Sequence, residues 1–253
     1  MIDQLWLIPL GFVAGVLGSM IGLGGGIIVV PVLTFFGFPP TLATSNSLFA
    51  AFSNAVASTI SYHRQKRIEY SLGLKLGLLT IPGTVLGAYI SSDVTPEIFK
   101  ILFGFVLIAS AVYIFLRKKL ESKEKNISKQ MMVFAIGASF FAGIISAFFG
   151  IGGGIVFVPL MVVGMGMAMK KAAPTSQLIL LFASFSGVAV HTALGHSDFL
   201  QAGLLASGSF VGGLVGARLS VDIRERYLQI LVSVVIIAAA AKMFWDSFSG
   251  NFV

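Results

Sequence analysis

Long apolar runs, separated by short charged or Pro/Gly-rich gaps, make up most of the chain. They fall at about 5–37, 41–62, 71–91, 98–116, 131–166, 174–192, 200–219 and 227–245. Six of these runs have 19–22 residues. A helix rises about 1.5 Å per residue, so this length suits one crossing of a bilayer core. The pattern therefore predicts an all-α polytopic membrane protein.

The runs that begin at Leu5 and Met131 are too long for one straight crossing. Each exceeds 30 residues, or roughly 50 Å of helix against a hydrocarbon core of about 30 Å. Each contains a glycine cluster, Gly22-Leu23-Gly24-Gly25-Gly26 in the first and Gly150-Ile151-Gly152-Gly153-Gly154 in the second. We expect each run to be broken there into two helical pieces, either as a pair of helices or as a re-entrant hairpin.

The two glycine clusters belong to a tandem duplication. A shift of 128 places Ala14–Leu33 on Ala142–Met161 with nine of twenty positions identical, and a shift of 131 places Thr44-Ser45-Asn46 on Thr175-Ser176-Gln177. Self-similarity at a fixed spacing is the mark of a repeated structural unit. The chain is therefore predicted to contain an N-terminal transmembrane repeat (1–120), a basic cytoplasmic linker (121–130) and a C-terminal transmembrane repeat (131–253).

Composition excludes the common alternatives to a membrane protein. The chain is 57% hydrophobic and 11% charged, where a soluble domain is about 45–50% apolar and about 25% charged. An ordinary soluble enzyme and a disordered chain are both excluded. No cysteine is present, so disulfides, Fe–S clusters and thiolate zinc sites are excluded too. Residues 1–4 lack the basic region of a cleavable signal peptide, so we expect the segment from Leu5 to be retained.

The placement of lysine and arginine indicates how the halves are oriented. The gap at 63–70 and the linker are basic, whereas the counterpart gap at 191–199 has neither Lys nor Arg. In the second half the basic residues lie in the other gaps, at Lys170, Lys171, Arg218, Arg224 and Arg226. Because short basic loops stay in the cytoplasm, we expect two inverted repeats of about four helical segments each. The alternative is a parallel repeat, which would leave five basic residues outside.

The glycine clusters are the strongest signal for a functional site. Broken backbone at membrane depth is tolerated only inside protein or along a polar cavity. The helical piece that follows each break presents free N–H groups and the positive end of its dipole. Two such ends near the midplane would form an anion site without a charged side chain. The alternative is that these glycines only let helices pack closely.

Neutral polar side chains begin the segment after each break. Thr44, Ser45 and Asn46, with Thr175, Ser176 and Gln177, could donate hydrogen bonds to an anion, or could instead cap helices and bond neighbouring helices. No acidic residue lies in the middle of an apolar run, and His63 and His191 are interpreted as near-equivalent loop histidines without a function. We therefore expect no catalytic activity, metal site or cofactor. The predicted substrate-binding residues are Gly24, Gly25, Gly26, Thr44, Ser45, Asn46, Gly152, Gly153, Gly154, Thr175, Ser176 and Gln177.

Two copies of G-x-GGG-x4-P, each followed by an A-x-TS or A-P-TS element, resemble the TauE/SafE family of membrane transporters. The resemblance covers essentially the whole chain. It implies a multi-pass protein of the cytoplasmic (inner) membrane that moves sulfur-containing anions such as sulfite, sulfoacetate and related sulfonates. It also implicates the glycines and polar residues named above in substrate binding.

The leading hypothesis is a secondary transporter, a probable exporter or permease, that works by alternating access of the two repeats. The alternatives are a passive anion channel and a membrane subunit that delivers substrate to a partner enzyme. The expected partners are a small anionic substrate and the lipid bilayer, without nucleic acid, and a homodimer is left open as the oligomeric state.

Overall fold

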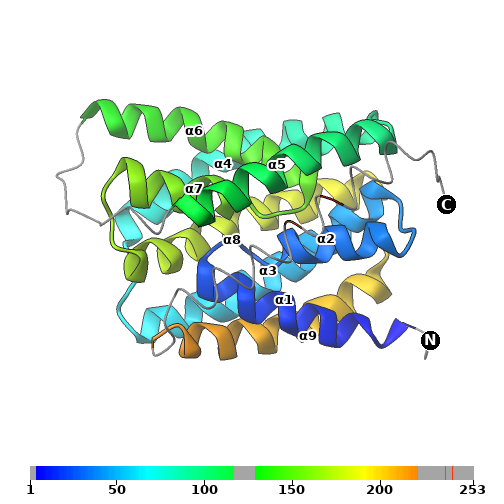
Figure 1. The fold of residues 1–253 in the computed structure, drawn as a ribbon, viewed down its shortest axis with the longest axis horizontal. Coiled ribbons are helices and arrows are strands. Elements are labelled where there is room, and N and C mark those ends of the chain that lie inside the picture. Colours follow the sequence, from blue (N-terminus) through cyan, green and yellow to red (C-terminus); the bar gives the residue numbers. More distant parts are fainter. Residues whose placement is uncertain (1–3, 117–128, 222–236, 238–240, 242–253) are drawn as a thin grey trace.

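The computed structural model describes residues 4–116, 129–221, 237 and 241, and within them all regular secondary structure is helical (Figure 1). The prediction of an all-α fold is thereby confirmed. Most of the predicted linker and of the run at 227–245 lies outside the described residues. The elements are α1 (Leu7–Ile21), α2 (Gly26–Phe35), α3 (Pro40–Arg64), α4 (Tyr70–Ser92), α5 (Pro96–Leu116), α6 (Lys129–Phe149), α7 (Gly154–Pro159), the π-helical turn η3 (Leu160–Gly164), α8 (Met169–Ala193) and α9 (Phe199–Leu219).

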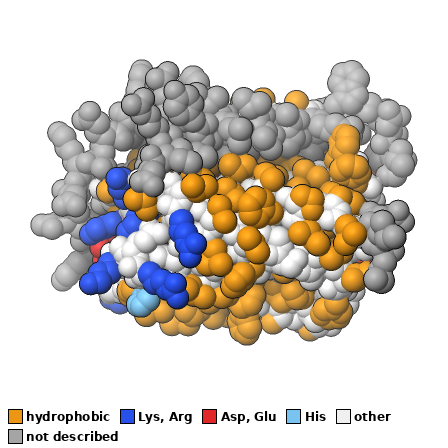
Figure 2. Space-filling view, turned by 90° about the horizontal axis from the view of Figure 1, so that it is seen from below, with side chains coloured by type: hydrophobic (Ala, Val, Ile, Leu, Met, Phe, Trp, Pro, Cys, Tyr) orange, Lys and Arg blue, Asp and Glu red, His pale blue; other side chains and the backbone are white. Residues whose placement is uncertain are grey.

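Four helices of the described part are long and apolar enough to cross a membrane: α4, α6 from Gln130, α8 and α9. Large apolar side chains also cover much of the outer surface, as Figure 2 shows for one face. Phe134 and Phe141 on α6 are each 64% exposed, and Phe199 on α9 is 66% exposed. Apolar surface of this extent is unfavourable in water but suits contact with lipid.

Helices of the N-terminal half pack against helices of the C-terminal half. α1 lies along α9, and α4 lies along α6 and α8, at opposite edges of the bundle (Figure 1). Glycines make this close approach possible, because a Cβ on Gly212 would overlap the Phe12 carbonyl oxygen and one on Gly83 would overlap that of Phe140. Small residues at such crossings allow backbones to touch, as is common between membrane helices.

The basic gaps of both halves meet at one end of the bundle, which we call the basic end. The Arg67 guanidinium Nε donates to the Lys170 carbonyl oxygen at 2.9 Å, and Lys171 Nζ lies 2.8 Å from Glu69 Oε1. Figure 2 shows lysine and arginine side chains gathered there. Because the start of α8 touches the connection that follows α3, these two helices run antiparallel.

Helix bounds correct the register that the sequence predicted for the second repeated element. α3 and α8 begin at Pro40 and Met169, which are 129 residues apart, and both have 25 residues. α4 and α9 begin at the same spacing. An offset of 129 pairs Asn46 with Thr175 and Ser47 with Ser176. The offset of 131, which paired Asn46 with Gln177, was wrong, because a match of three small polar residues is too short to fix a helix register.

Candidate functional site

The first glycine cluster ends one helix and starts another inside the bundle. α1 ends at Ile21, Gly22 and Gly24 follow with φ of +81° and +76°, and α2 begins at Gly26. Residues with a Cβ rarely adopt this left-handed conformation. The glycines therefore permit the break, and all residues from Ile21 to Val30 are buried.

The second cluster forms the corresponding break. α6 ends at Phe149, and Gly150, Gly152 and Gly153 all have positive φ before α7 begins at Gly154. α7 is six residues long and continues through Pro159 into η3. The chain thus returns to helical structure at the same place in both motifs.

The two breaks are in contact with each other. A Cβ on Gly26 would overlap the carbonyl oxygen of Gly150, and a Cβ on Gly154 would overlap that of Gly22. Each second helical piece therefore starts directly against the first glycine of the opposite motif. Glycine is therefore required at Gly26 and Gly154 for the close approach of the two backbones.

Serines from α3 and α8 donate hydrogen bonds to backbone carbonyl groups at the breaks. Ser47 Oγ donates to Gly150 O at 2.9 Å, and Ser176 Oγ donates to Gly22 O at 2.7 Å. Gln177 Nε2 donates to Gly18 O at 2.9 Å. Carbonyls at helix ends lack an intrahelical donor, so the two serines replace it, whereas Gln177 adds a donor to Gly18 O, which already accepts from the Gly22 and Leu23 amides. Each serine reaches across to the break of the other half.

A second polar layer lies nearer the ends of the bundle. The Asp198 backbone N–H donates to Asn46 Oδ1 at 3.3 Å, and the Glu69 N–H donates to Thr175 Oγ1 at 3.0 Å. Residues 69 and 198 are again 129 apart, so the two bonds are counterparts. Asn46 Nδ2 also donates to Gln201 Oε1 at 3.0 Å. These two predicted site residues hold interhelical connections in place.

The twelve predicted site residues are all buried, but they divide into separate groups. Ser176, Gln177 and the glycines meet at the breaks. Asn46 and Thr175 bond to connections at opposite ends, and Ser45 Oγ lies 2.7 Å from Ser197 Oγ in the α8–α9 connection. Thr44 lies against the second break, with its Cα 2.9 Å from the position of a Cβ on Gly150.

Several polar groups at the two breaks have no hydrogen-bond partner in the described part of the chain. Within the described residues, the backbone N–H groups of Gly24, Gly25 and Gly26 meet no acceptor. Thr44 Oγ1, beside the second break, is buried without a partner, and so is one acceptor near the first break, Gln177 Oε1. Buried polar groups normally have partners. The first carbonyl of each break is thus bound by a serine, while several N–H donors at the breaks have no partner in the described part of the chain.

Tyr62 and His191 are two residues at the breaks whose importance the sequence did not indicate. Tyr62 Oη donates to Ser19 O at 2.8 Å near the end of α1, and His191 Nε2 lies 2.9 Å from Ala147 O near the end of α6. His191 is fully buried. The equivalence of His191 with His63 was wrong: the offset of 129 pairs it with Tyr62. Only the corrected helix register would have revealed this pair.

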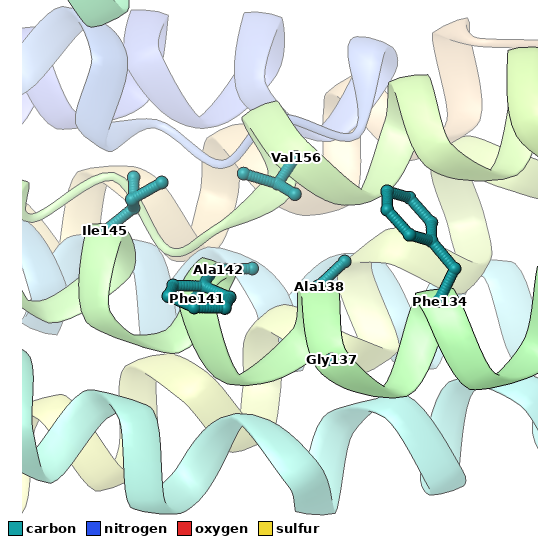
Figure 3. A pocket seen from close by; sticks show the side chains of 7 residues that line it. All are labelled: Phe134, Gly137, Ala138, Phe141, Ala142, Ile145 and Val156. Carbon is teal, nitrogen blue, oxygen red and sulfur yellow. The ribbon is translucent and has the colours of Figure 1, made fainter.

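A cavity of about 380 Å³ opens on the flank of α6 and α7 (Figure 3). Its lining is entirely apolar, with Phe134, Ala138, Phe141 and Ile145 on α6 facing Val156 on α7. Such a lining offers an anion no hydrogen-bond donor. We therefore place the candidate anion site at the breaks and not in this cavity.

Comparison with known proteins agrees with these features. The family model described as "Sulfite exporter TauE/SafE" matches residues 7–243. The chain is 29% identical to the probable membrane transporter protein YunE of Bacillus subtilis, over 95% of this chain and 97% of that protein. It is 27% identical to the probable membrane transporter protein MJ0441 of Methanocaldococcus jannaschii, over 90% of each chain. It is 25% identical to the probable membrane transporter protein YfcA of Escherichia coli K12, over 98% of this chain and 93% of that protein.

Proposed function

Because the chain belongs to the TauE/SafE sulfite exporter family of membrane transporters, we propose that it is a secondary transporter of small sulfur-containing anions, such as sulfite or sulfoacetate, in the cytoplasmic membrane. One observation carries the proposal: the two helix breaks touch inside the bundle, a serine binds the first carbonyl of each, and several backbone N–H donors of the described residues there have no acceptor. We propose no catalytic activity.

Unoccupied donors at a helix N-terminus suit an anion. The N–H groups of Gly24–Gly26 precede α2, a helix of ten residues, so its dipole adds to their attraction. Sulfonyl and carboxylate oxygens accept hydrogen bonds from neutral donors. Thr44 and the second cluster, Gly152–Gly154, complete the proposed site, which holds an anion without a fixed positive charge.

The contacts that each half makes with the break of the other half support alternating access by two inverted repeats. α3 and α8 run antiparallel, and each bonds to the break of the other half. A rocking motion of one half against the other would act on both breaks together, as in transporters built from inverted repeats. The basic end would face the cytoplasm.

Inverted topology predicts a definite labelling pattern. The chain has no cysteine, so the single variants Arg64→Cys, Lys170→Cys and Asp93→Cys can each be tested with an impermeant maleimide. Arg64 and Lys170 should react only from the cytoplasmic side, and Asp93 only from outside, because the first two lie at the basic end. Reaction of Arg64→Cys and Lys170→Cys from opposite sides would refute the topology.

Thr44→Val tests the proposed site without removing a structural contact. Thr44 Oγ1 has no partner among the described residues, so its loss should leave the unfolding temperature unchanged or raise it. A hydrogen bond to a charged group contributes about 1.5–3 kcal/mol, so the KM for the transported anion should rise by roughly tenfold to a hundredfold.

Thr59→Val is the matched control, because Thr59 is on the same helix and its Oγ1 also lacks a partner in the described part. It lies about 22 Å along α3 from Thr44. Its KM should equal that of the wild type. Equal KM values for Thr44→Val and the wild type would remove Thr44 from the site.

Proteoliposome counterflow is the direct test of function. Vesicles loaded with unlabelled sulfoacetate or sulfite should accumulate the labelled anion transiently, and accumulation should saturate with concentration. A passive anion channel would instead show conductance that reverses at the anion's equilibrium potential, without saturable counterflow. Absence of counterflow for both anions would reject this substrate class.

A further inference from the structure

A chain of hydrogen bonds connects the second break with the end of the bundle opposite the basic end. His191 Nε2 lies 2.9 Å from Ala147 O, three residues before Gly150. His191 Nδ1 lies 3.0 Å from Nδ1 of His196, which is partly exposed in the α8–α9 connection. The His196 backbone N–H also donates to His191 O at 3.0 Å. The two imidazoles thus join the exterior to the last turn of α6.

The partners of each ring define the tautomers of the neutral pair. A carbonyl oxygen only accepts, so His191 Nε2 carries the proton and His191 Nδ1 has the lone pair. His196 Nδ1 must then donate to it, and His196 Nε2 retains a basic lone pair. One added proton on His196 Nε2 leaves every bond of the chain intact. A second added proton would place an N–H group on both Nδ1 atoms, which face each other. The geometry therefore favours uptake of one proton by the pair.

The charged groups around the pair do not bond to it in the described part of the chain. Asp198 Oδ1 accepts from the Leu200 and Gln201 amides at the start of α9. Asp93, Glu97 and Lys100 lie at the α4–α5 connection. Among the helices packed against α8, His63 and Arg64 on α3, Lys75 on α4 and Lys129 on α6 lie toward the far end of their helices. Tyr89 lies in the last turns of α4 at the same end as the pair, and its side chain is exposed. Partial burial lowers the pKa of His196.

The first half has the same cap without a titratable group near neutral pH. Tyr62 Oη donates to Ser19 O, at the position that corresponds to the His191 bond, and a tyrosine hydroxyl stays protonated at neutral pH. Among the residues that the structure describes, the second break alone is therefore linked to a group that can gain a proton under physiological conditions. Because Tyr62 occupies the position that corresponds to His191, we attribute to the histidine a function beyond capping the end of α6.

We propose that the His191–His196 pair is the proton-binding site that couples anion transport to the pH gradient. The proposal rests on the transport function proposed above. A positive charge on the pair strengthens the bond to Ala147 O and interacts favourably with the C-terminal end of α6. Protonation therefore holds α6 and the second break against α8, and loss of the proton releases them.

Histidine NMR titration tests proton binding independently of any substrate. The chain has three histidines, and His63, bonded to Tyr70 Oη at 2.6 Å at the basic end, serves as the internal reference. We expect His191 and His196 to take up one proton between them. In His196→Gln the His191 curve should change and the His63 curve should not. Independent uptake of one proton by each ring, or an unchanged His191 curve, would overturn the proposal.

Transport of sulfoacetate tests the coupling, since its sulfonate and carboxylate stay ionised across the pH range used. At one proton per anion, an imposed difference of about one pH unit should drive roughly tenfold accumulation. His191→Gln can still donate to Ala147 O and accept from His196, but it removes the imidazole that brings the positive charge of the pair to the end of α6. We expect His191→Gln to lose gradient-driven accumulation and retain counterflow. We expect the same of His196→Gln, in which the substituted residue lies in the α8–α9 connection.

His63→Gln is the control and should behave as wild type in both assays. Gradient-driven accumulation that persists in both pair variants, or a wild type that ignores the gradient while showing counterflow, would overturn the coupling site and leave the transport function standing. Absence of counterflow in the wild type would overturn the transport of sulfoacetate, and the coupling proposal with it.

Discussion

Gly26→Ala should reduce counterflow about a hundredfold, because the two breaks would have to separate by an amount of the order of 1 Å and a displacement of that size has an effect of this order at a precisely arranged site. The new Cβ would overlap the carbonyl oxygen of Gly150, which is backbone and cannot rotate aside as a side chain would. Overpacking of this kind should also lower the free energy of unfolding by about 1–3 kcal/mol or more. Counterflow and thermal unfolding of the purified variant measure the two effects.

Gly203→Ala is the matched control for this change. Gly203 is an exposed helical glycine on α9 with nothing within 4 Å of the position of a Cβ. Alanine there should raise stability by up to about 1 kcal/mol through helix propensity and leave transport unchanged. Gly154→Ala should reproduce the Gly26→Ala defect, because its Cβ would overlap Gly22 O. Wild-type transport by Gly26→Ala would show that contact between the breaks is not required.

Ser47→Ala and Ser176→Ala should each cost about 1–3 kcal/mol of unfolding free energy, the penalty for removing a donor from a buried carbonyl. Ser47 Oγ donates to Gly150 O and Ser176 Oγ to Gly22 O. Both variants should also slow transport, because each frees one break from the helix that holds it. Thermal unfolding and the maximal counterflow rate measure the outcome.

Ser207→Ala removes the same kind of bond from an exposed position, since Ser207 Oγ donates to Leu204 O at 2.7 Å. Its effect should be within about 0.5 kcal/mol. Ser176 was among the residues predicted to bind substrate and Ser47 was not. Similar losses of stability and rate at unchanged KM would assign both serines to holding the breaks, whereas a raised KM for Ser176→Ala alone would assign Ser176 to substrate contact.

Much of the candidate site could be predicted from local chemistry. Glycine is the residue that adopts positive φ without strain, so the clusters at Gly22–Gly26 and Gly150–Gly154 identified the positions where the structure ends α1 and α6. The predicted polar residues are also all buried. The roles of Asn46 and Thr175 could not be predicted, because their partners Asp198 and Glu69 lie more than 100 residues away in the chain.

The offset between the two repeats is another feature that the sequence alone did not determine. Glycine and proline positions made the duplication evident near the breaks, but on α3 a short match of Thr and Ser suggested the wrong register. Helix length and contacts corrected it, and the correction paired His191 with Tyr62. The residue offset between the two repeats is established only when several contacts give the same value.

The sequence by itself determined the membrane class, the duplication and the places where the helices break. These properties depend on composition and on the backbone freedom of glycine, both of which are local. The tertiary structure alone decided that the two breaks touch, that serines of each half bind the other half's carbonyls, and that His191 and His196 form a pair. The contacts of the breaks and of the serines join residues more than 100 positions apart in the chain, and any hydrogen bond forms only where packing brings both of its atoms together.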